Sequence, residues 1–171
     1  MIERLAKQLA VSIKTANPER TSSVEVMKFS LIILLNALSI IILTMSIGMI
    51  TGVFNEAVIV IIGFALLRFF SGGLHLPTSE WCIAASTAVL VVVAHLPIYG
   101  YTSWVTLASL VLVVLFAPAR VEEHHRIAQT KTMLFKAVAI LIVASNFFWS
   151  SDALAKALLV QSLLVLPIKR R

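Results

Sequence analysis

The sequence predicts an all-α membrane protein with six short transmembrane helices, an N-terminal amphipathic interfacial helix, and both termini in the cytoplasm. Of its 171 residues, 60% are hydrophobic and only 13% are charged, whereas soluble domains have shares near one half and one quarter. A helix that crosses a bilayer uses about 20 residues, so the chain has room for about six spans and little else. This excludes a soluble domain and a large extramembrane domain, and it predicts one polytopic membrane domain over 1–171.

The first element predicted is an amphipathic helix within residues 1–17. Ile2, Leu5, Leu9 and Ile13 recur at steps of three and four residues, with cationic residues between them. Such a helix fits the membrane surface with its apolar side down, and a solvated helical arm is the alternative. Asn17-Pro18 should end it. We expect no cleaved signal peptide, because the long apolar run begins only at residue 29.

A six-span bundle is predicted over residues 22–168. The first span covers 29–50, and Ser22 with Glu25 three residues later fits a helix cap. The second covers 53–70, with charged residues near its two ends.

The remaining spans follow from the next uncharged stretches. Residues 81–119 contain no Lys, Arg, Asp or Glu and are too many for one span, so they predict two spans joined by a turn at 97–101. The fifth and sixth spans, at 134–149 and 153–167, are short, and one re-entrant hairpin is the alternative for this pair. Polar Asn36, Asn146 and Gln161 are interpreted as hydrogen-bonding links between helices.

The distribution of cations predicts the orientation. With six spans and both termini inside, all of the 14 Lys and Arg residues except Lys156 fall on the cytoplasmic side. Topology therefore explains the net charge of +6 without a nucleic-acid partner. The basic tail at 169–171 fits contact with anionic lipid.

The inner loop at 68–82 carries the candidate catalytic residues. It contains His75 and the single cysteine, Cys82. An imidazole can take a thiol proton and leave a reactive thiolate, which is the minimum for nucleophilic catalysis. One cysteine excludes an internal disulfide.

The local sequence suggests how these two side chains meet. An unbroken helix would separate them by about 10 Å, but Pro77 and the glycine pair make such a helix unfavourable. We therefore expect His75 on a turning loop and Cys82 in the first turn of the third span, with Thr78 or Ser79 as its N-cap. The helix dipole then favours the thiolate.

No third catalytic residue is evident in the sequence. Glu80 could orient His75, but a solvated charge in the first helical turn is the simpler interpretation. Oxyanion donors could come from the backbone N–H groups of Trp81 and Cys82, or from the turn at Gly72-Gly73. His95 lies toward the opposite face, so it is excluded from the site and expected to bond a neighbouring carbonyl.

A second inner loop contains Glu122-Glu123-His124-His125. With His75 and Cys82 these residues suggest a zinc site, but adjacent histidines lack the i,i+4 spacing of the usual metalloprotease motif. We therefore predict no metal and no cofactor.

The pattern of Arg68, three residues, Gly72-Gly73, one residue, His75, six residues and Cys82 resembles the accessory gene regulator B (AgrB) family. These are membrane cysteine endopeptidases that process quorum-sensing propeptides. The resemblance covers nearly the whole chain, including the basic amphipathic start and a basic loop that opens with Ala117-Pro118. Leu76 and Pro77 depart from the usual family pattern.

The resemblance implies that Cys82 is the nucleophile and His75 the general base and later the general acid. The implied substrate is an AgrD-like propeptide with an amphipathic leader, a central cysteine or serine, and an acidic tail, and a homodimer is also implied. Gly72, Gly73, Arg68 and Glu80 are candidate supporting residues, and Arg120, Arg126 and Lys131 are candidates for binding the acidic tail.

Two other classes of function remain open. A non-enzymatic small membrane transporter or assembly partner would carry Cys82 as an incidental thiol, and a metal-dependent membrane protease would use the histidines instead. Localisation in the bacterial plasma membrane, with the active site at the cytoplasmic face, follows from the orientation and the resemblance.

Overall fold

The computed structural model describes residues 2–73, 78–118 and 129–166, with the backbone alone for 129–131. These residues form helices and connectors and contain no strand, which confirms the all-α class. The helices are α1 (Ile2–Ala16), α2 (Val24–Ile50), α3 (Phe54–Ser71), α4 (Ser79–His95), α5 (Thr102–Phe116), α6 (Gln129–Trp149) and α7 (Asp152–Leu163).

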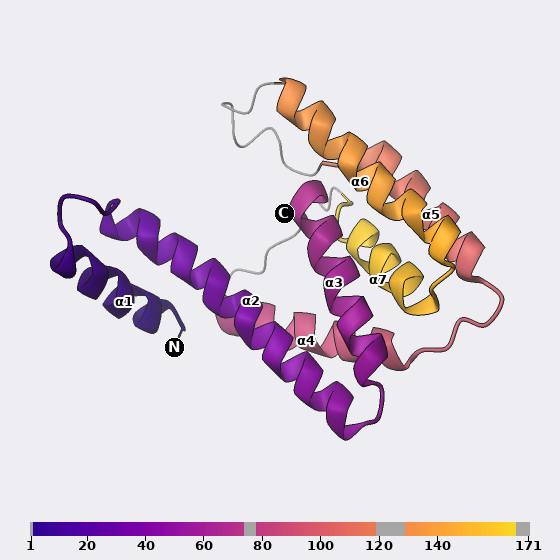
Figure 1. The fold of residues 1–171 in the computed structure, drawn as a ribbon, viewed down its shortest axis with the longest axis horizontal. Helices are drawn as coiled ribbons and strands as arrows, with labels where there is room; N and C mark the ends of the chain where they lie inside the picture. Colours follow the sequence, from indigo (N-terminus) through magenta and orange to yellow (C-terminus); the bar gives the residue numbers. More distant parts are fainter. Residues whose placement is uncertain (1, 74–77, 119–128, 167–171) are drawn as a thin grey trace.

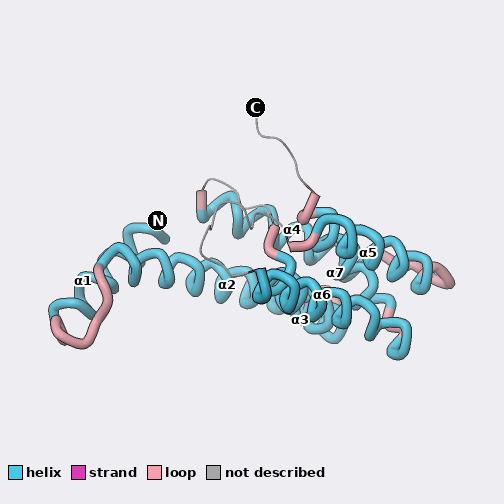
Figure 2. The backbone as a smooth tube through the Cα atoms, turned by 90° about the horizontal axis from the view of Figure 1, so that it is seen from above, coloured by secondary structure: helices cyan, strands magenta, loops and turns pink. Residues whose placement is uncertain are grey.

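α7, the shortest of the described helices, contacts α3, α4, α5 and α6 (Figure 1). It lies mainly against α3 and α5, and most of its side chains are buried. α6 packs on α5 and α3, while α2 and α4 pair with each other on the other side of α3. Figure 2 shows α1 and the first half of α2 extending beyond the other helices.

Proline-containing connectors end helices where the sequence predicts. α1 ends at Ala16, directly before Asn17-Pro18. The long uncharged stretch divides into α4 and α5 around the connector at 96–101, and α5 ends at Phe116 before Pro118. A proline cannot donate to the helix ladder and disfavours helical dihedrals in the residue before it.

Three predicted boundaries were wrong. α6 begins at Gln129 rather than near 134. α2 begins at Val24 rather than near residue 29, and Ser23, not Ser22, is its N-cap and accepts from the Val26 N–H at 3.4 Å. Charges mark the limits of an apolar span, but a helix can continue through them. α7 ends at Leu163 rather than at 167. A proline at 167 has no N–H to bond the carbonyl four positions before it, at residue 163.

In the part of the chain that the structure describes, three helices are long and apolar enough to cross a membrane. They are α2, α3 and residues 132–149 of α6. α4 and α5 are apolar but shorter. The 12 residues of α7 extend about 18 Å at 1.5 Å per residue, less than a hydrocarbon core of about 30 Å. The six-span topology therefore remains a prediction for the short helices.

α1 packs along α2, which the sequence did not predict. The chain reverses after α1, so that the two helices form an antiparallel hairpin (Figure 1). Ala6 and Ala10 are fully buried on this interface. Leu5 and Leu9 remain 46% and 38% exposed, so an apolar surface is still available for lipid.

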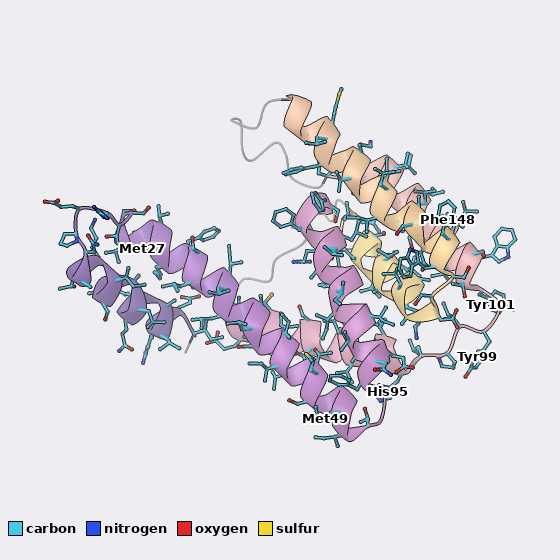
Figure 3. The ribbon with its side chains drawn as sticks, viewed as in Figure 1. Met27, Met49, His95, Tyr99, Tyr101 and Phe148 are labelled. Carbon is cyan, nitrogen blue, oxygen red and sulfur yellow. The ribbon has the colours of Figure 1, made fainter. Side chains whose placement is uncertain are left out.

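Hydrogen bonds define two ends of the bundle. At one, called the Leu96 end, Lys156 donates to the Leu96 carbonyl and Thr102 donates to the Asp152 carboxylate. Figure 3 shows His95, Tyr99 and Tyr101 at this end, and both tyrosines are exposed. At the other, the Cys82 end, α3 and α7 finish close to the start of α4.

The interhelical role predicted for Asn146 and Gln161 is confirmed. Asn146 Nδ2 donates to Thr106 Oγ1 at 2.9 Å, which links α6 to α5. Gln161 links α7 to α3. Asn36 is buried between α2 and its neighbours, but its Oδ1 has no hydrogen-bond partner in the part of the chain that the structure describes.

Candidate active site

Cys82 lies in the first turn of α4, as the sequence predicts. Thr78 is the N-cap, with extended dihedrals and a side-chain oxygen that accepts from the Trp81 N–H at 3.4 Å. The Cys82 N–H donates to the Thr78 carbonyl at 3.0 Å. The cysteine is only 8% exposed, so the thiol is held inside the bundle rather than in the loop.

The other half of the predicted dyad, His75, lies outside the described residues, as does Pro77. The same holds for Arg120, Arg126 and the Glu122 to His125 cluster, and for the side chain of Lys131. Among the residues that are described, no group of three His, Cys, Asp or Glu side chains is placed to hold a metal ion. The zinc interpretation stays untested.

Cys82 lines a cavity of about 340 Å³ between α3, α4 and α7. Four of its lining residues lie at Cys82 and three, four and seven positions beyond it, along one face of α4. The rest come from α3 and from the C-terminal part of α7. The lining consists of Phe64, Arg68, Cys82, Ala85, Ser86, Val89, Val160, Leu163 and Leu164.

The cavity has a buried side and an open side. Phe64 and Cys82 are both 8% exposed and form the inner wall. Val89 and Leu163 are 41% and 45% exposed, and Ala85 is also exposed. The cavity therefore opens on the flank of the bundle, between α4 and α7.

Arg68 provides the cationic group of this cavity. Its Nη1 donates to Gln161 Oε1 at 3.3 Å, and its guanidinium carbon lies 5.6 Å from the centre of the Phe64 ring, within cation–π range. Arg68 and Cys82 line the same cavity, so the guanidinium is the charged group next to the thiol on the α3 side.

Gln161 holds the polar groups next to the cavity, a role beyond the interhelical link that its sequence context predicts. It is fully buried, and its Nε2 donates to Ser71 Oγ at 3.1 Å and to the Gly72 carbonyl at 2.6 Å. Together with its bond to Arg68, this joins α7 to the C-terminal turn of α3 and to the glycine pair. A glutamine among the apolar residues near the end of α7 was the available signal, but its partners are about ninety positions away.

The close approach of Gln161 and Arg68 explains the second glycine of the pair. Gly73 has a φ of +144°, which L side chains rarely adopt. A Cβ atom there would lie 3.2 Å from Gln161 Nε2 and 3.3 Å from Arg68 Nη1. A side chain at this position would therefore disturb the two polar groups next to the cavity.

One suggested oxyanion hole was wrong. The N–H groups of Trp81 and Cys82 already donate to the side chain and carbonyl of Thr78. The Gly72 N–H is likewise bonded, to the Arg68 carbonyl at 2.9 Å. Glu80 is exposed in the first turn of α4.

His95 is correctly excluded from the site. It lies at the C-terminal end of α4, with its Nδ1 2.8 Å from the Val91 carbonyl of the same helix. It lies thirteen positions along the helix from Cys82, about 20 Å. The predicted bond to a neighbouring carbonyl is confirmed.

The fold and the site define a class: a helical membrane protein in which a buried cysteine, at the start of a short helix, shares an apolar cavity with an arginine. The chain belongs to the accessory gene regulator B family, whose model matches residues 2–166. This family is associated with the processing of AgrD propeptides, which indicates a peptidase role.

A curated relative from Halalkalibacterium halodurans is 26% identical over 174 aligned positions, which cover 98% of this chain and 88% of that protein. It is named "Putative AgrB-like protein". No solved structure significantly matches the chain.

Proposed function

We propose that this chain is a membrane-embedded cysteine endopeptidase, which removes the C-terminal tail of an AgrD-like quorum-sensing propeptide and promotes its cyclisation to a thiolactone or lactone. The observation that carries the proposal is the placement of Cys82, buried in the first turn of α4 and facing a cavity shared with Arg68. Family membership supports propeptide processing as the biological setting.

In the proposed reaction, His75 takes the proton of Cys82, and the thiolate attacks the carbonyl carbon that precedes the tail. The C–N bond breaks, the imidazolium returns the proton to the departing amine, and the peptide remains bound as a thioester on Cys82. The peptide's own thiol or hydroxyl then attacks this thioester and passes its proton to His75. The ring closes and the Cys82 thiolate is regenerated.

The residues on either side of the His75 segment support the proposal that His75 acts on Cys82. Gly73 lies beside Arg68 and Gln161, and Thr78 caps the helix that carries Cys82. Two residues of chain extend at most about 7 Å, so His75 is tethered to a residue that already lies beside the cavity. The proposed dyad is compatible with this restraint.

The apolar surroundings of Cys82 suit a thioester intermediate. Exchange between a thioester and a thiol is nearly balanced, whereas hydrolysis of the same thioester is downhill. Exclusion of water protects such an intermediate, and the near-complete burial of Cys82 provides it. Conversion of an amide to a thioester is uphill. Net cyclisation should therefore proceed only when the released tail or the cyclic peptide is removed.

We further propose that Arg120, Arg126 and Lys131 attract the acidic tail of the propeptide. Exposed charges are screened beyond about 10 Å at 0.1 M salt, so tail binding should weaken as salt rises. The positive-inside rule alone also explains these cations. Unchanged tail binding at low salt after charge-neutral substitution of all three would refute the attraction.

The proposed setting is the bacterial plasma membrane, with the Cys82 end at the cytoplasmic face, both termini inside, and a homodimer as the assembly. Arg68 at the Cys82 end fits this orientation, and Lys156 at the Leu96 end is the one cation that the orientation places outside. Cysteine labelling at residues 24 and 99, in a Cys82→Ala background, would test it with an impermeant reagent.

Coexpression with a cognate propeptide tests the function. Wild type should release the tail, whereas Cys82→Ala and His75→Ala should not, and Cys82→Ser should be strongly impaired. Thiol alkylation should abolish cleavage and a metal chelator should not. Tail release by Cys82→Ala would refute the proposal, and sensitivity to the chelator would favour a metalloprotease.

A further inference from the structure

We infer that the cavity between α3, α4 and α7 is the subsite for the substrate residue on the acyl side of the cut bond. It selects a large apolar side chain that enters through the flank of the bundle. This inference rests on the proposed function, because it uses the covalent link between substrate and Cys82. It adds a substrate preference and an entry direction that the family membership does not supply.

The position of Cys82 in the cavity wall identifies which substrate residue occupies the cavity. Cys82 is part of the cavity wall, and in the thioester its sulfur is bonded to the carbonyl carbon of the residue before the cut. The side chain of that residue is then only two bonds from the acyl carbon. The departing tail leaves from the same carbon, so the cavity serves the retained part of the peptide.

The chemistry of the walls sets the preference. Apart from Arg68, Cys82 and Ser86, every lining residue has an aliphatic or aromatic hydrocarbon side chain. The volume of about 340 Å³ is near the lower limit of small-molecule pockets, about 300–1,000 Å³. It therefore suits one or two side chains rather than a longer segment of peptide.

Arg68 does not turn this cavity into an anion site. Its guanidinium is already held by Gln161 and lies over the Phe64 ring. A carboxylate entering here would lose its hydration among apolar walls, which is costly without several compensating bonds. An apolar side chain incurs no such cost.

The open side of the cavity indicates the route by which the substrate side chain enters. Ala85, Val89 and Leu163 are exposed on the flank between α4 and α7, two helices that contact each other less than α7 contacts α3 or α5. α4 is an apolar helix, so this flank faces the hydrocarbon region when α4 is in the membrane. A membrane-bound peptide can then insert its side chain sideways, without passing through water.

Ala85→Phe tests the cavity, with Ala84→Phe as the matched control. Both alanines are exposed on α4, but only Ala85 lines the cavity. In the detergent-purified chain, N-phenylmaleimide should alkylate Cys82 at least tenfold faster than N-(4-carboxyphenyl)maleimide, after correction for their rates with glutathione. Ala85→Phe should slow the phenyl reagent at least fivefold, and Ala84→Phe should change it less than twofold.

The second readout is cleavage of AgrD-like propeptides with Phe, Leu, Ala or Asp before the cut. Wild type should prefer Phe and Leu over Ala and Asp by about tenfold, and Ala85→Phe should reverse the order of Phe and Ala. If all four are cleaved equally, or if Asp is preferred, the subsite assignment falls while the endopeptidase stands. If none is cleaved although the maleimides behave as expected, the proposed function fails and the assignment fails with it.

Discussion

Gln161 of α7 accepts a hydrogen bond from the guanidinium of Arg68 on α3 at 3.3 Å, although 93 positions separate them in the sequence. The same amide donates to the Gly72 carbonyl. One buried side chain thus fixes the position of the cationic group beside Cys82 and that of the chain leaving α3. This arrangement makes Gln161 a positioning residue for the proposed reaction.

Gln161→Leu should lower both stability and cleavage. Buried partners left unsatisfied cost about 1–3 kcal/mol each, and the substitution removes bonds to Arg68, Ser71 and Gly72. We expect a loss of about 2–4 kcal/mol in unfolding free energy, measured in detergent, and a fall in kcat of at least tenfold with a smaller change in KM. Ser162→Ala is the control, because Ser162 is buried on the same helix but bonds only within it, to the Leu158 carbonyl. Equal effects of the two substitutions on kcat would contradict the positioning role.

Arg68→Gln should reduce cleavage. The substitution removes the guanidinium, which bonds Gln161 and lies over the Phe64 ring beside Cys82. We expect a several-fold fall in tail release, measured by coexpression with a cognate propeptide. Arg68→Lys should also reduce cleavage, because an ammonium lacks the planar fork that Gln161 and Phe64 hold. Unchanged cleavage in both variants would show that the site does not need the guanidinium.

Thr78→Ala should loosen the turn that carries Cys82. Loss of an N-cap costs about 0.5–2 kcal/mol, and Thr78 supplies the acceptor for the Trp81 N–H. We expect faster alkylation of Cys82 and a several-fold loss of cleavage, since the thiol is less firmly placed. Thr78→Ser keeps the side-chain acceptor and should behave as wild type. If Ser and Ala give the same alkylation rate, the cap has no part in holding the nucleophile.

Local features of the sequence predicted the helices and the place of Cys82. Pro18, Pro97 and Pro118 restrict the backbone wherever they occur, so helix ends near them can be predicted from the chain alone. Thr78 before an apolar run identifies the start of α4, and with it the first-turn position of the cysteine. The prediction of Ser22 as the N-cap of α2 was wrong by one position, because the adjacent Ser23 offers the same capping chemistry.

Long-range packing could not be predicted in the same way. The apolar residues of α1 suit lipid as well as protein, so periodicity gives no indication that Ala6 and Ala10 pack on α2. The cavity depends on α3, α4 and α7 meeting at one end, and a polar residue such as Gln161 has several possible partners until those helices are placed. The cluster at Arg68, Gly72 and Gln161 therefore emerges only from the tertiary structure.

Lys156→Met should destabilise the protein without impairing the chemistry. Lys156 is 9% exposed and donates to the Leu96 carbonyl at the Leu96 end. Hydrogen bonds to charged groups contribute about 1.5–3 kcal/mol, so the unfolding free energy should fall by about that amount. Cleavage at low temperature should stay within twofold of wild type, because Cys82 lies at the other end of α4 from Leu96.

Lys7→Met, at an exposed position on α1, is the control and should change neither quantity appreciably. A large loss of cleavage in folded Lys156→Met protein would show that the two ends of the bundle are coupled.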